Sequence, residues 1–389
     1  MIESMETTEF KPTDLSNILS NDSNIIKVVG VGGGGCNAVN HMFELGIKDV
    51  TFVVCNTDQQ ALRHSPVPNQ IILGDDGLGA GAQPERAAEA AEKSLVAIER
   101  MFKETPTKMA FITAGMGGGT GTGASPLIAK VAHDLEILTV GVVTIPFAFE
   151  GKKKIKQALR GVLELSKNVD AILVVNNQKL VENFHLKIEA AFKMADDVLA
   201  TAVKSIAEII TIHGYMNVDF ADVRTTMKDS KVALMNIGEG EGDNRIIDAI
   251  ENALKTPLLE TADILQAKKL LINITCSHED EITTDELAKL TNFTDEIEGV
   301  DVITGITYDE SLGAKVKVTL IATGFTSDAL PKAIDDINPK DGSDDDELGR
   351  SAEKYYGTGN SKKKIDLPDL DNDAILEEIQ NTPAFKRMK

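Results

Sequence analysis

Two glycine-rich segments, each placed between an apolar run and a helical stretch, constrain this chain more than any other feature. The first is VGVGGGGCNAVN, residues 29–40, and the second is ITAGMGGGTGTGASP, residues 112–126. Glycine lets backbone N–H groups approach a phosphate where a Cβ would collide. The first segment fits the spacing G-x-G-x-x-G, which alone is also compatible with a tight strand-to-helix turn. Two such helix N-termini in one sheet can converge on a single polyphosphate.

The second segment differs from a P-loop because it lacks the Lys-Ser/Thr pair. Phosphate charge then has to be met by backbone dipoles, by a metal ion and by the hydroxyls of Thr120 and Thr122. The base-reading motif N-K-x-D is also missing, since NNQK at 176–179 does not match it. A nucleotide-binding site of another kind is expected.

The hydrophobic pattern predicts an α/β fold. Five runs that are apolar throughout predict parallel strands covered on both faces, at residues 25–31, 50–56, 108–115, 138–146 and 170–177. A helix is expected over 124–135, after the second glycine segment. Helical spacing of apolar residues predicts one long, largely buried helix over 188–214. A second unit follows, with strands at 232–238, 269–276, 301–309 and 315–324 and helices near 244–255 and 283–292.

Composition excludes several classes of protein. A formal net charge of −21 argues against unaided binding to nucleic acid or anionic lipid. No apolar run is long enough to cross a bilayer, and the polar, acidic first two dozen residues do not form a signal peptide. The three cysteines are far apart in sequence, which fits a reducing cytoplasm and argues against a disulfide framework or a zinc site.

The motif GGGTGTG at 117–123, preceded by AGM, resembles the signature loop of the tubulin superfamily and of its bacterial cell-division branch, the FtsZ family. The resemblance covers roughly residues 25–325. It extends, in order and at compatible spacing, across GVGGGGCNAV (30–39), NTDQQAL (56–62), GLGAGAQPE (77–85), PFAFEGKKK (146–154) and MNVDFADVR (216–224). It implies the tubulin/FtsZ fold: a Rossmann-like parallel-sheet GTPase domain, a long central helix, a smaller α/β domain and disordered termini.

With this resemblance the chain divides into six parts. They are a disordered extension (1–24), a GTP-binding domain (25–187), the central helix (188–214), a C-terminal activation domain (215–330), a disordered acidic linker (331–372) and a partner-binding peptide (373–389). The implied function is a GTPase that polymerises head to tail into the cytokinetic ring, in the cytoplasm at mid-cell on the inner face of the membrane. GTP or GDP, with Mg²⁺, is the implied ligand.

The resemblance also assigns the phosphate-binding residues. The first phosphate and base loop is formed by Gly33, Gly34, Gly35, Cys36 and Asn37, the main phosphate loop by Gly119, Thr120 and Gly121, and the loop that senses the γ-phosphate by Gly79, Ala80 and Gly81. Glu150 is implied to accept hydrogen bonds from the ribose. Lys154 stands where the family commonly has arginine, so it keeps the charge but loses the planar fork.

Phe192 and Asp196 are implied to read the base. They lie four residues apart and so share one face of the predicted helix. Without the resemblance, Phe192 reads as a core residue and Asp196 as part of a solvated face. With it, the ring stacks on the purine, and the carboxylate accepts the N1–H and N2–H of guanine but would be left unpaired by adenine.

The catalytic residues are implied to act on the neighbouring subunit. Asn217, Asp219 and Asp222 would enter the adjoining nucleotide site and position the attacking water. From the sequence alone, Asp219 and Asp222 read as an N-cap and a first-turn acid of a helix.

The last residues, DAILEEIQNTPAFKRMK, resemble the family's C-terminal peptide, which binds membrane-tethering division proteins such as FtsA. Two alternatives to a division GTPase stay open at this point. One is a nicotinamide-dependent oxidoreductase, for which Asp58 would be the acidic residue after the second strand. The other is a tubulin-like filament protein that serves plasmids or cell shape.

Overall fold

The computed structural model describes residues 24–181, 187–212, 214–255, 267–295 and 299–325. The predictions for the N-terminal extension up to residue 23, the acidic linker and the C-terminal peptide lie outside these residues. Among the helices of the described ranges, none is long and apolar enough to cross a membrane.

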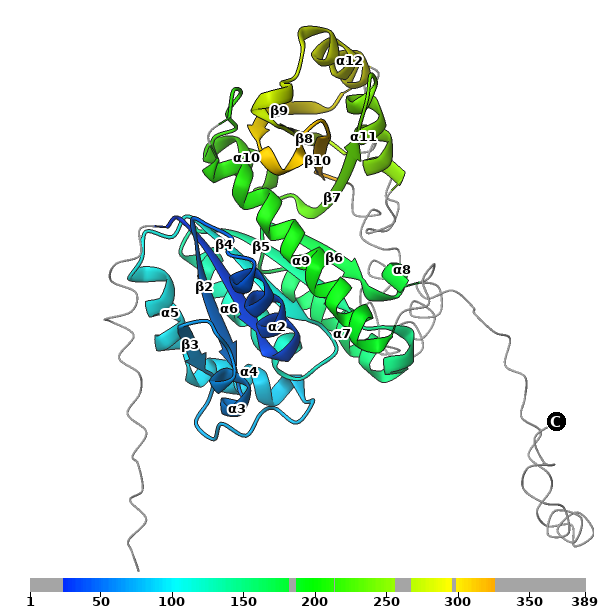
Figure 1. Cartoon of the computed structure of the whole chain (residues 1–389). Coiled ribbons are helices and arrows are strands. Elements are labelled where there is room, and N and C mark those ends of the chain that lie inside the picture. The colour runs from blue at the N-terminus through cyan, green and yellow to red at the C-terminus, as the bar shows by residue number, and fades with distance from the viewer. Residues whose placement is uncertain (1–23, 182–186, 213, 256–266, 296–298, 326–389) are drawn as a thin grey trace, which may run out of the picture. The chain divides into compact units, whose positions relative to one another are not determined.

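The N-terminal half contains six parallel strands in the order β3-β2-β1-β4-β5-β6 (Figure 1). They are β1 (Ile26–Val31), β2 (Val50–Asn56), β3 (Asn69–Ile72), β4 (Met109–Gly115), β5 (Leu138–Ile145) and β6 (Ala171–Asn176). The five predicted strands are confirmed to within a residue or so at each end. The edge strand β3 was not predicted, because its four residues, NQII, carry only two apolar side chains.

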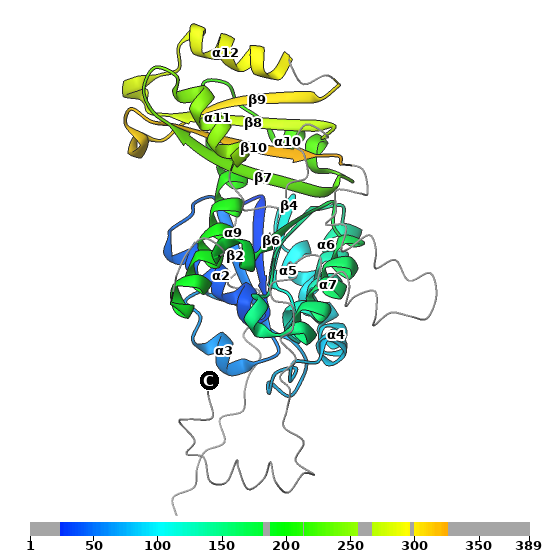
Figure 2. The same cartoon turned by 90° about the vertical axis from the view of Figure 1, so that its right-hand side faces the viewer.

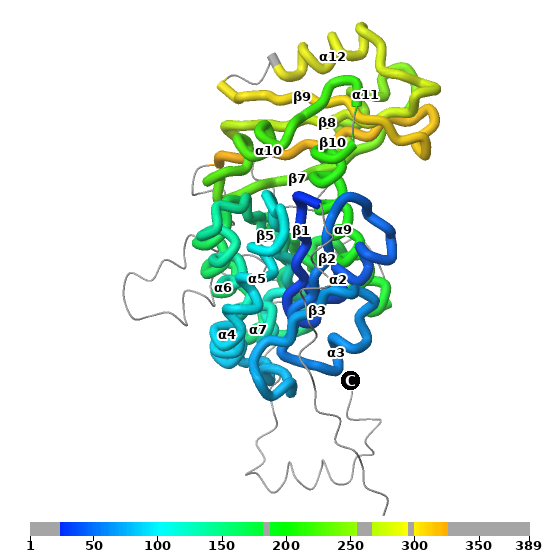
Figure 3. Tube along the Cα trace, turned by 90° about the vertical axis from the view of Figure 1, so that its left-hand side faces the viewer, coloured from blue at the N-terminus to red at the C-terminus, as the bar shows by residue number. Residues whose placement is uncertain are grey.

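Helices cover both faces of this sheet, as its uninterrupted apolar strands require (Figures 2 and 3). One face packs against α2 (Gly32–Glu44) and α9 (Ile188–Thr211). The other packs against α6 (Thr120–Asp134) and α7 (Lys152–Ser166), with α4 (Pro84–Lys93) and α5 (Leu95–Lys103) beside α6. Short helices α3 (Gln59–Arg63) and α8 (Asn177–Val181) and the 3₁₀ turn η1 (Ala148–Glu150) complete this half.

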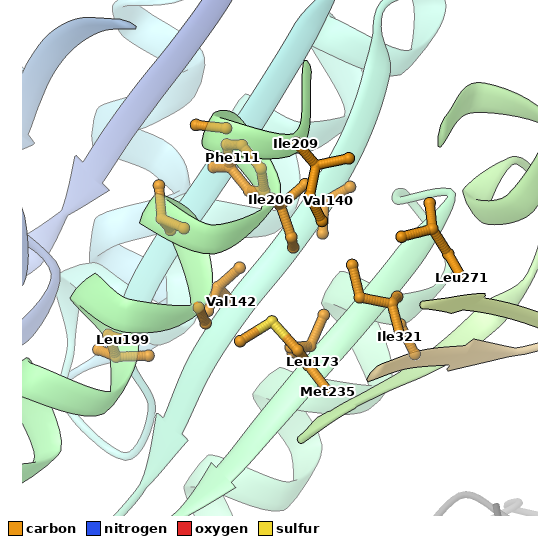
Figure 4. Packing of buried hydrophobic residues seen from close by; sticks show 14 of the residues in the cluster. Phe111, Val140, Val142, Leu173, Leu199, Ile206, Ile209, Met235, Leu271 and Ile321 are labelled. Carbon is orange, nitrogen blue, oxygen red and sulfur yellow. The ribbon is translucent and has the colours of Figure 1, made fainter. Parts of the chain in front are cut away.

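One part of the core lies between the sheet and α9. Figure 4 shows Leu199, Ile206 and Ile209 of α9 facing strand residues such as Val140 and Val142 of β5, all of them almost completely buried. The predicted long helix is confirmed, but it ends at Thr211 and not at Gly214. The Gly214 N–H instead donates to Asn217 Oδ1 at 2.7 Å, which begins the loop to the next helix.

The second unit continues the same sheet. Strand β7 (Lys231–Gly240) pairs in parallel with β6 at two positions, and the order then runs β7-β10-β8-β9. These strands are β10 (Val316–Thr323), β8 (Lys269–Cys276) and β9 (Asp301–Tyr308), with β10 antiparallel to both of its neighbours. The accompanying helices are α10 (Phe220–Met227), α11 (Arg245–Lys255) and α12 (Thr284–Asp295), with turns η3 (His278–Asp280) and η4 (Glu310–Leu312).

Candidate functional site

Both glycine segments begin at the point where the strand order of the sheet reverses. Strands β1 and β4 are neighbours, and the chain leaves them toward opposite faces, into α2 and α6. Ligands of doubly wound sheets bind at this switch point, beyond the carboxyl ends of the strands. Helix α2 starts directly at Gly32, and α6 starts at Thr120, four residues earlier than the sequence predicted. Two helix N-termini therefore flank one position, which favours an anion.

The two segments touch each other through their backbones. A Cβ on Gly32, whose φ is +72°, would lie 2.5 Å from the Gly121 nitrogen, and one on Gly34 would lie 3.1 Å from the Gly115 Cα. A Cβ on Gly35 would be even more crowded, at 2.3 Å from the Thr113 carbonyl oxygen. A Cβ on Gly33 or on Gly118 would meet nothing within 4 Å. We call the surface formed by the two glycine segments the glycine cradle. Its inner side is tightly packed, and its outer side is open.

A third segment, residues 79–83, closes on the second glycine segment. A Cβ on Gly119 would lie 2.9 Å from the Ala80 Cβ, and Gly79 and Gly81 both have positive φ. The hydroxyls of Thr57 and Thr120 are 2.7 Å apart and hydrogen-bonded. Sequence reasoning missed Arg86, whose Nη1 lies 3.7 Å from the position of a Cβ on Gly81. Its signal is the QPER motif that starts α4, and it brings a cation near the segment expected to face the γ-phosphate.

The fourth segment, residues 147–154, lies beside Gly117, where a Cβ would be 2.8 Å from the Lys154 carbonyl oxygen. Glu150 accepts the Phe147 N–H at 3.0 Å through Oε1 and the Lys154 ammonium at 3.2 Å through Oε2. The expected ribose acceptor is thus fixed in place by its own turn. A carboxylate has about four lone-pair positions, so Glu150 keeps capacity for further hydrogen bonds.

Two residues that were expected to contact the nucleotide use their side chains for hydrogen bonds within the protein. The Thr122 hydroxyl accepts the Gly117 N–H at 2.9 Å and so holds the shape of its own loop. The Cys36 thiol donates to the carbonyl oxygens of Gly30 and Cys55, and burial raises its pKa to about 12. Cys36 therefore faces a ligand with its backbone and not with a reactive thiolate, whereas Asn37 is exposed.

Three phenylalanines form an aromatic cluster where the 147–154 segment meets α9. Phe192 on α9 meets Phe147 edge to face, with centroids 5.0 Å apart, and Phe149 stacks on Phe147 at 5.0 Å. Phe149 and Phe192 are 61 % and 41 % exposed, unusual for phenylalanine, and their rings lie 6.4 Å apart at 82°. Phe149 was missed because the sequence offers no pattern for it. Exposed rings of this kind are suited to contact a planar base.

Asp196 lies one turn after Phe192 on the same face of α9. Burial raises its pKa to about 6, with His41 opposing and Asp197 adding to the shift. A half-buried carboxylate with a raised pKa has lost water and has not gained an equivalent partner. Functional sites are where such groups gather.

Other buried polar atoms also fit a nucleotide. At the end of β6, the Asn176 Nδ2 and Asn177 Oδ1 atoms are buried without a hydrogen-bond partner among the described residues. A buried polar atom of this kind calls for a ligand or a solvent molecule. Asp58 does not fit the oxidoreductase alternative, because its carboxylate caps α3 by accepting the N–H groups of Gln60 and Ala61.

Comparison with known proteins agrees with this geometry. Residues 25–185 match the model of the Tubulin/FtsZ family, GTPase domain, and residues 231–326 match the FtsZ family, C-terminal domain. The curated cell division protein FtsZ of Porphyromonas gingivalis is 45% identical over 393 residues, covering 93% of this chain and 85% of that protein. The chain belongs to the tubulin/FtsZ family.

Further relatives support the membership. The cell division protein FtsZ of Buchnera aphidicola is 41% identical and covers 98% of this chain and 99% of its own length. The empty FtsZ dimer of M. jannaschii superposes with a TM-score of 0.71 at 37% identity, covering 80% of this chain and 90% of that one. CetZ2 of Haloferax volcanii, at 18% identity and a TM-score of 0.69, shares the fold. As a tubulin/FtsZ-family member, this protein is a tubulin-like GTPase of cell division.

The acidic loop that the tubulin/FtsZ resemblance singled out lies far from the glycine cradle. Asp219 and Asp222 form a capping box at the start of α10, each accepting the other's N–H, at 2.9 and 3.2 Å. At the other end of α10, the Asp229 N–H donates to the buried Asp170 at the amino end of β6. The cradle sits at the carboxyl ends of the same strands. Phe192 and Thr211 are separated by almost the whole of α9, about 30 Å at 1.5 Å per residue.

Proposed function

We propose that this protein hydrolyses GTP in filaments formed by head-to-tail association, with each active site completed by the next subunit. The observation that carries the proposal is the separation just described. The glycine cradle has donors, dipoles and a nearby cation. The acidic loop with Asn217, Asp219 and Asp222 lies on the side of the amino ends of these strands, away from the cradle at their carboxyl ends. Within one copy the two cannot meet.

Recognition of the nucleotide is divided among the four segments of the cradle. The N-termini of α2 and α6 hold the phosphates through Gly33–Asn37 and Gly119–Gly121, and the 79–81 segment meets the γ-phosphate. Glu150 and Lys154 lie at the ribose side, and Phe192 and Asp196 read guanine. A magnesium ion bound with the nucleotide supplies charge neutralisation; we assign it no ligand from the chain.

Hydrolysis requires positioning and charge stabilisation more than covalent chemistry. The Asp219 and Asp222 carboxylates of a second copy, together with Asn217, would orient the attacking water on the γ-phosphate. In the free subunit the two aspartates are already fixed by their mutual capping hydrogen bonds. The negative charges of the phosphates and of the acidic loop would repel each other. The dipoles of α2 and α6, and a magnesium ion bound with the nucleotide, would offset this repulsion.

An association that joins one end of a molecule to the opposite end of the next does not close and makes a filament. The M. jannaschii relative was solved as a dimer, which supports self-association. We propose that the filaments form the division ring at mid-cell, in the cytoplasm. The segment 373–389 would link them to membrane tethers such as FtsA. The naming of the curated relatives as division proteins favours this role over plasmid or shape functions.

The test is GTP hydrolysis measured against protein concentration, with sedimentation in GTP and in GDP. Turnover per molecule should be near zero at low concentration and rise above a threshold at which the protein also pellets in GTP. Turnover per molecule that is constant at all concentrations would mean a self-contained site and would refute completion in trans.

A further inference from the structure

One side-chain hydrogen bond joins the two helices that hold opposite ends of the nucleotide site. The His41 Nε2 lies 2.6 Å from the Asp197 Oδ1. His41 is in the last turn of α2, with a side chain only 20% exposed, and Asp197 is on α9, adjacent to Asp196. Neither residue was singled out by the sequence, where His41 is one polar residue of a helix and Asp197 one of two consecutive acids.

The contact gives the two consecutive carboxylates different tasks. Asp197 points to α2 and is held by His41. Asp196 is half-buried on the face of α9 that also carries Phe192. The charged groups that act on Asp196 are His41 from α2 and Asp197 from its own helix. Fixing Asp197 against His41 therefore leaves Asp196 as the carboxylate available to the base.

The same contact fixes the distance between the phosphate end and the base end of the site. Helix α2 carries Gly33–Cys36 in its first turn and His41 in its last, so it moves as one rigid piece. It packs against α9 through a buried seam that includes Ala38 and Met42 on α2 and Ala195 and Leu199 on α9. Packing of these buried side chains holds the two helices together without a directional contact. The hydrogen bond between His41 and Asp197, at the edge of the seam, adds one and fixes the position of α9 along α2.

We propose that His41 and Asp197 form a positioning pair that sets α9, and with it Phe192 and Asp196, at the spacing from the phosphate cradle that GTP requires. This rests on the proposed nucleotide site. The ligand recognised through the pair is a guanine nucleotide with both its base and its phosphates engaged. A ligand with phosphates alone uses only the α2 and α6 ends and does not depend on the pair.

The experiment compares His41→Ala, Asp197→Asn and the double variant, by titration calorimetry with GTP and with inorganic triphosphate. Each single variant should weaken GTP binding about three- to fivefold, the range for the loss of one side-chain hydrogen bond. Binding of triphosphate should stay unchanged. The double variant should be no weaker than either single, because the second change removes nothing further. His41→Arg, which keeps an N–H donor facing Asp197, should restore most of the affinity, and kcat at saturating GTP should be unaffected.

Lys103→Ala is the matched control. Lys103 and Glu99 form an equally short pair, 2.6 Å, on the surface of α5, and its loss should change neither ligand. Additive effects of the two single changes, GTP affinity equal to wild type, or a parallel loss of triphosphate binding would each overturn the pair's positioning role. Failure of the proposed function looks different: the wild-type protein itself would bind GTP no better than triphosphate.

Discussion

The neighbouring glycines 33 and 35 are required for different reasons. Gly35 packs against the Thr113 carbonyl oxygen, so that no side chain fits in the folded protein. Gly33 has open space around its Cβ position and lies on the exposed side of the cradle. Gly35 serves the fold, and Gly33, in the proposed site, serves the approach of a phosphate to the backbone.

A pair of alanine variants separates the two reasons. Gly35→Ala should lower the free energy of unfolding by about 2 kcal/mol or more, because the backbone of β4 must shift to make room. Gly33→Ala should leave the thermal melting curve nearly unchanged and weaken GTP binding about tenfold or more. Melting curves and GTP titrations of both variants check this. Equal loss of stability in the two would contradict the assignment.

Asp196 should make nucleotide binding depend on pH. Its pKa is raised to about 6 by burial, so the carboxylate is charged above that pH and protonated below it. In the proposed site, only the charged form would accept both guanine N–H groups, and GTP affinity should therefore fall as pH drops through 6. Titrations from pH 7.5 to 5 measure the effect, and Asp196→Asn should flatten the profile. Inorganic triphosphate serves as the control ligand, since it does not reach Asp196.

At the scale of elements, α11 and α12 are joined by one buried arginine. Arg245, the first residue of α11, donates to Glu286 at 2.7 Å and to Asp280 at 2.6 Å, and also to the Ala314 and Glu281 carbonyl oxygens. Burial alone would raise the pKa of Glu286, but hydrogen bonds from Arg245 and Thr283 outweigh it and hold the pKa at about 2. This lowered pKa stabilises the fold above pH 4.5, and the contribution is lost as pH falls toward 2.

Removing the arginine should destabilise the C-terminal unit strongly. Arg245→Met leaves Glu286, whose side chain is only 13% exposed, without its arginine partner, at a cost of about 3 kcal/mol in the free energy of unfolding. Asp280→Asn, which changes a half-exposed partner, should cost less than about 1 kcal/mol. Urea unfolding at pH 7 compares the two. Similar midpoints would show that the network does not join the helices.

The elements were the most predictable level of this protein. Buried strands such as β4 and β5 are apolar throughout, so the sequence alone predicts them and a sheet covered on both faces. The helix starts were harder: α6 begins inside its glycine segment, because the helix N-terminus is itself part of the cradle. No sequence pattern predicts which distant residues will contact each other, as His41 does Asp197 or Phe149 does Phe192. Only the packed fold brings them together.

At the scale of the whole molecule, the division of the proposed active site can be tested by mixing two inactive variants. Asp222→Asn keeps an acceptor for the α10 cap but loses the charge, so it should bind GTP and turn it over at least a hundredfold more slowly than wild type. Gly118→Val places a side chain in the open space of the cradle and should abolish GTP binding while its acidic loop stays intact.

The mixture should recover part of the wild-type turnover. A junction that pairs the nucleotide of the Asp222→Asn variant with the loop of the Gly118→Val variant is complete, whereas every other pairing lacks at least one half. Turnover should be highest near equal amounts of the two. A mixture no more active than the sum of its components would mean that no site is shared between copies.

In the proposed filament, the placement of cradle and acidic loop at opposite ends of α9 also sets a direction. One terminal subunit would present an open nucleotide cradle, and the other would present an acidic loop with no nucleotide beside it. Such a filament would always hold one complete active site fewer than it has subunits. Short filaments would therefore hydrolyse less GTP per subunit than long ones, and a nucleotide could enter or leave freely at one tip alone. Breaking the filament anywhere would disrupt one complete site and open one cradle, so fragmentation and nucleotide exchange would become the same event.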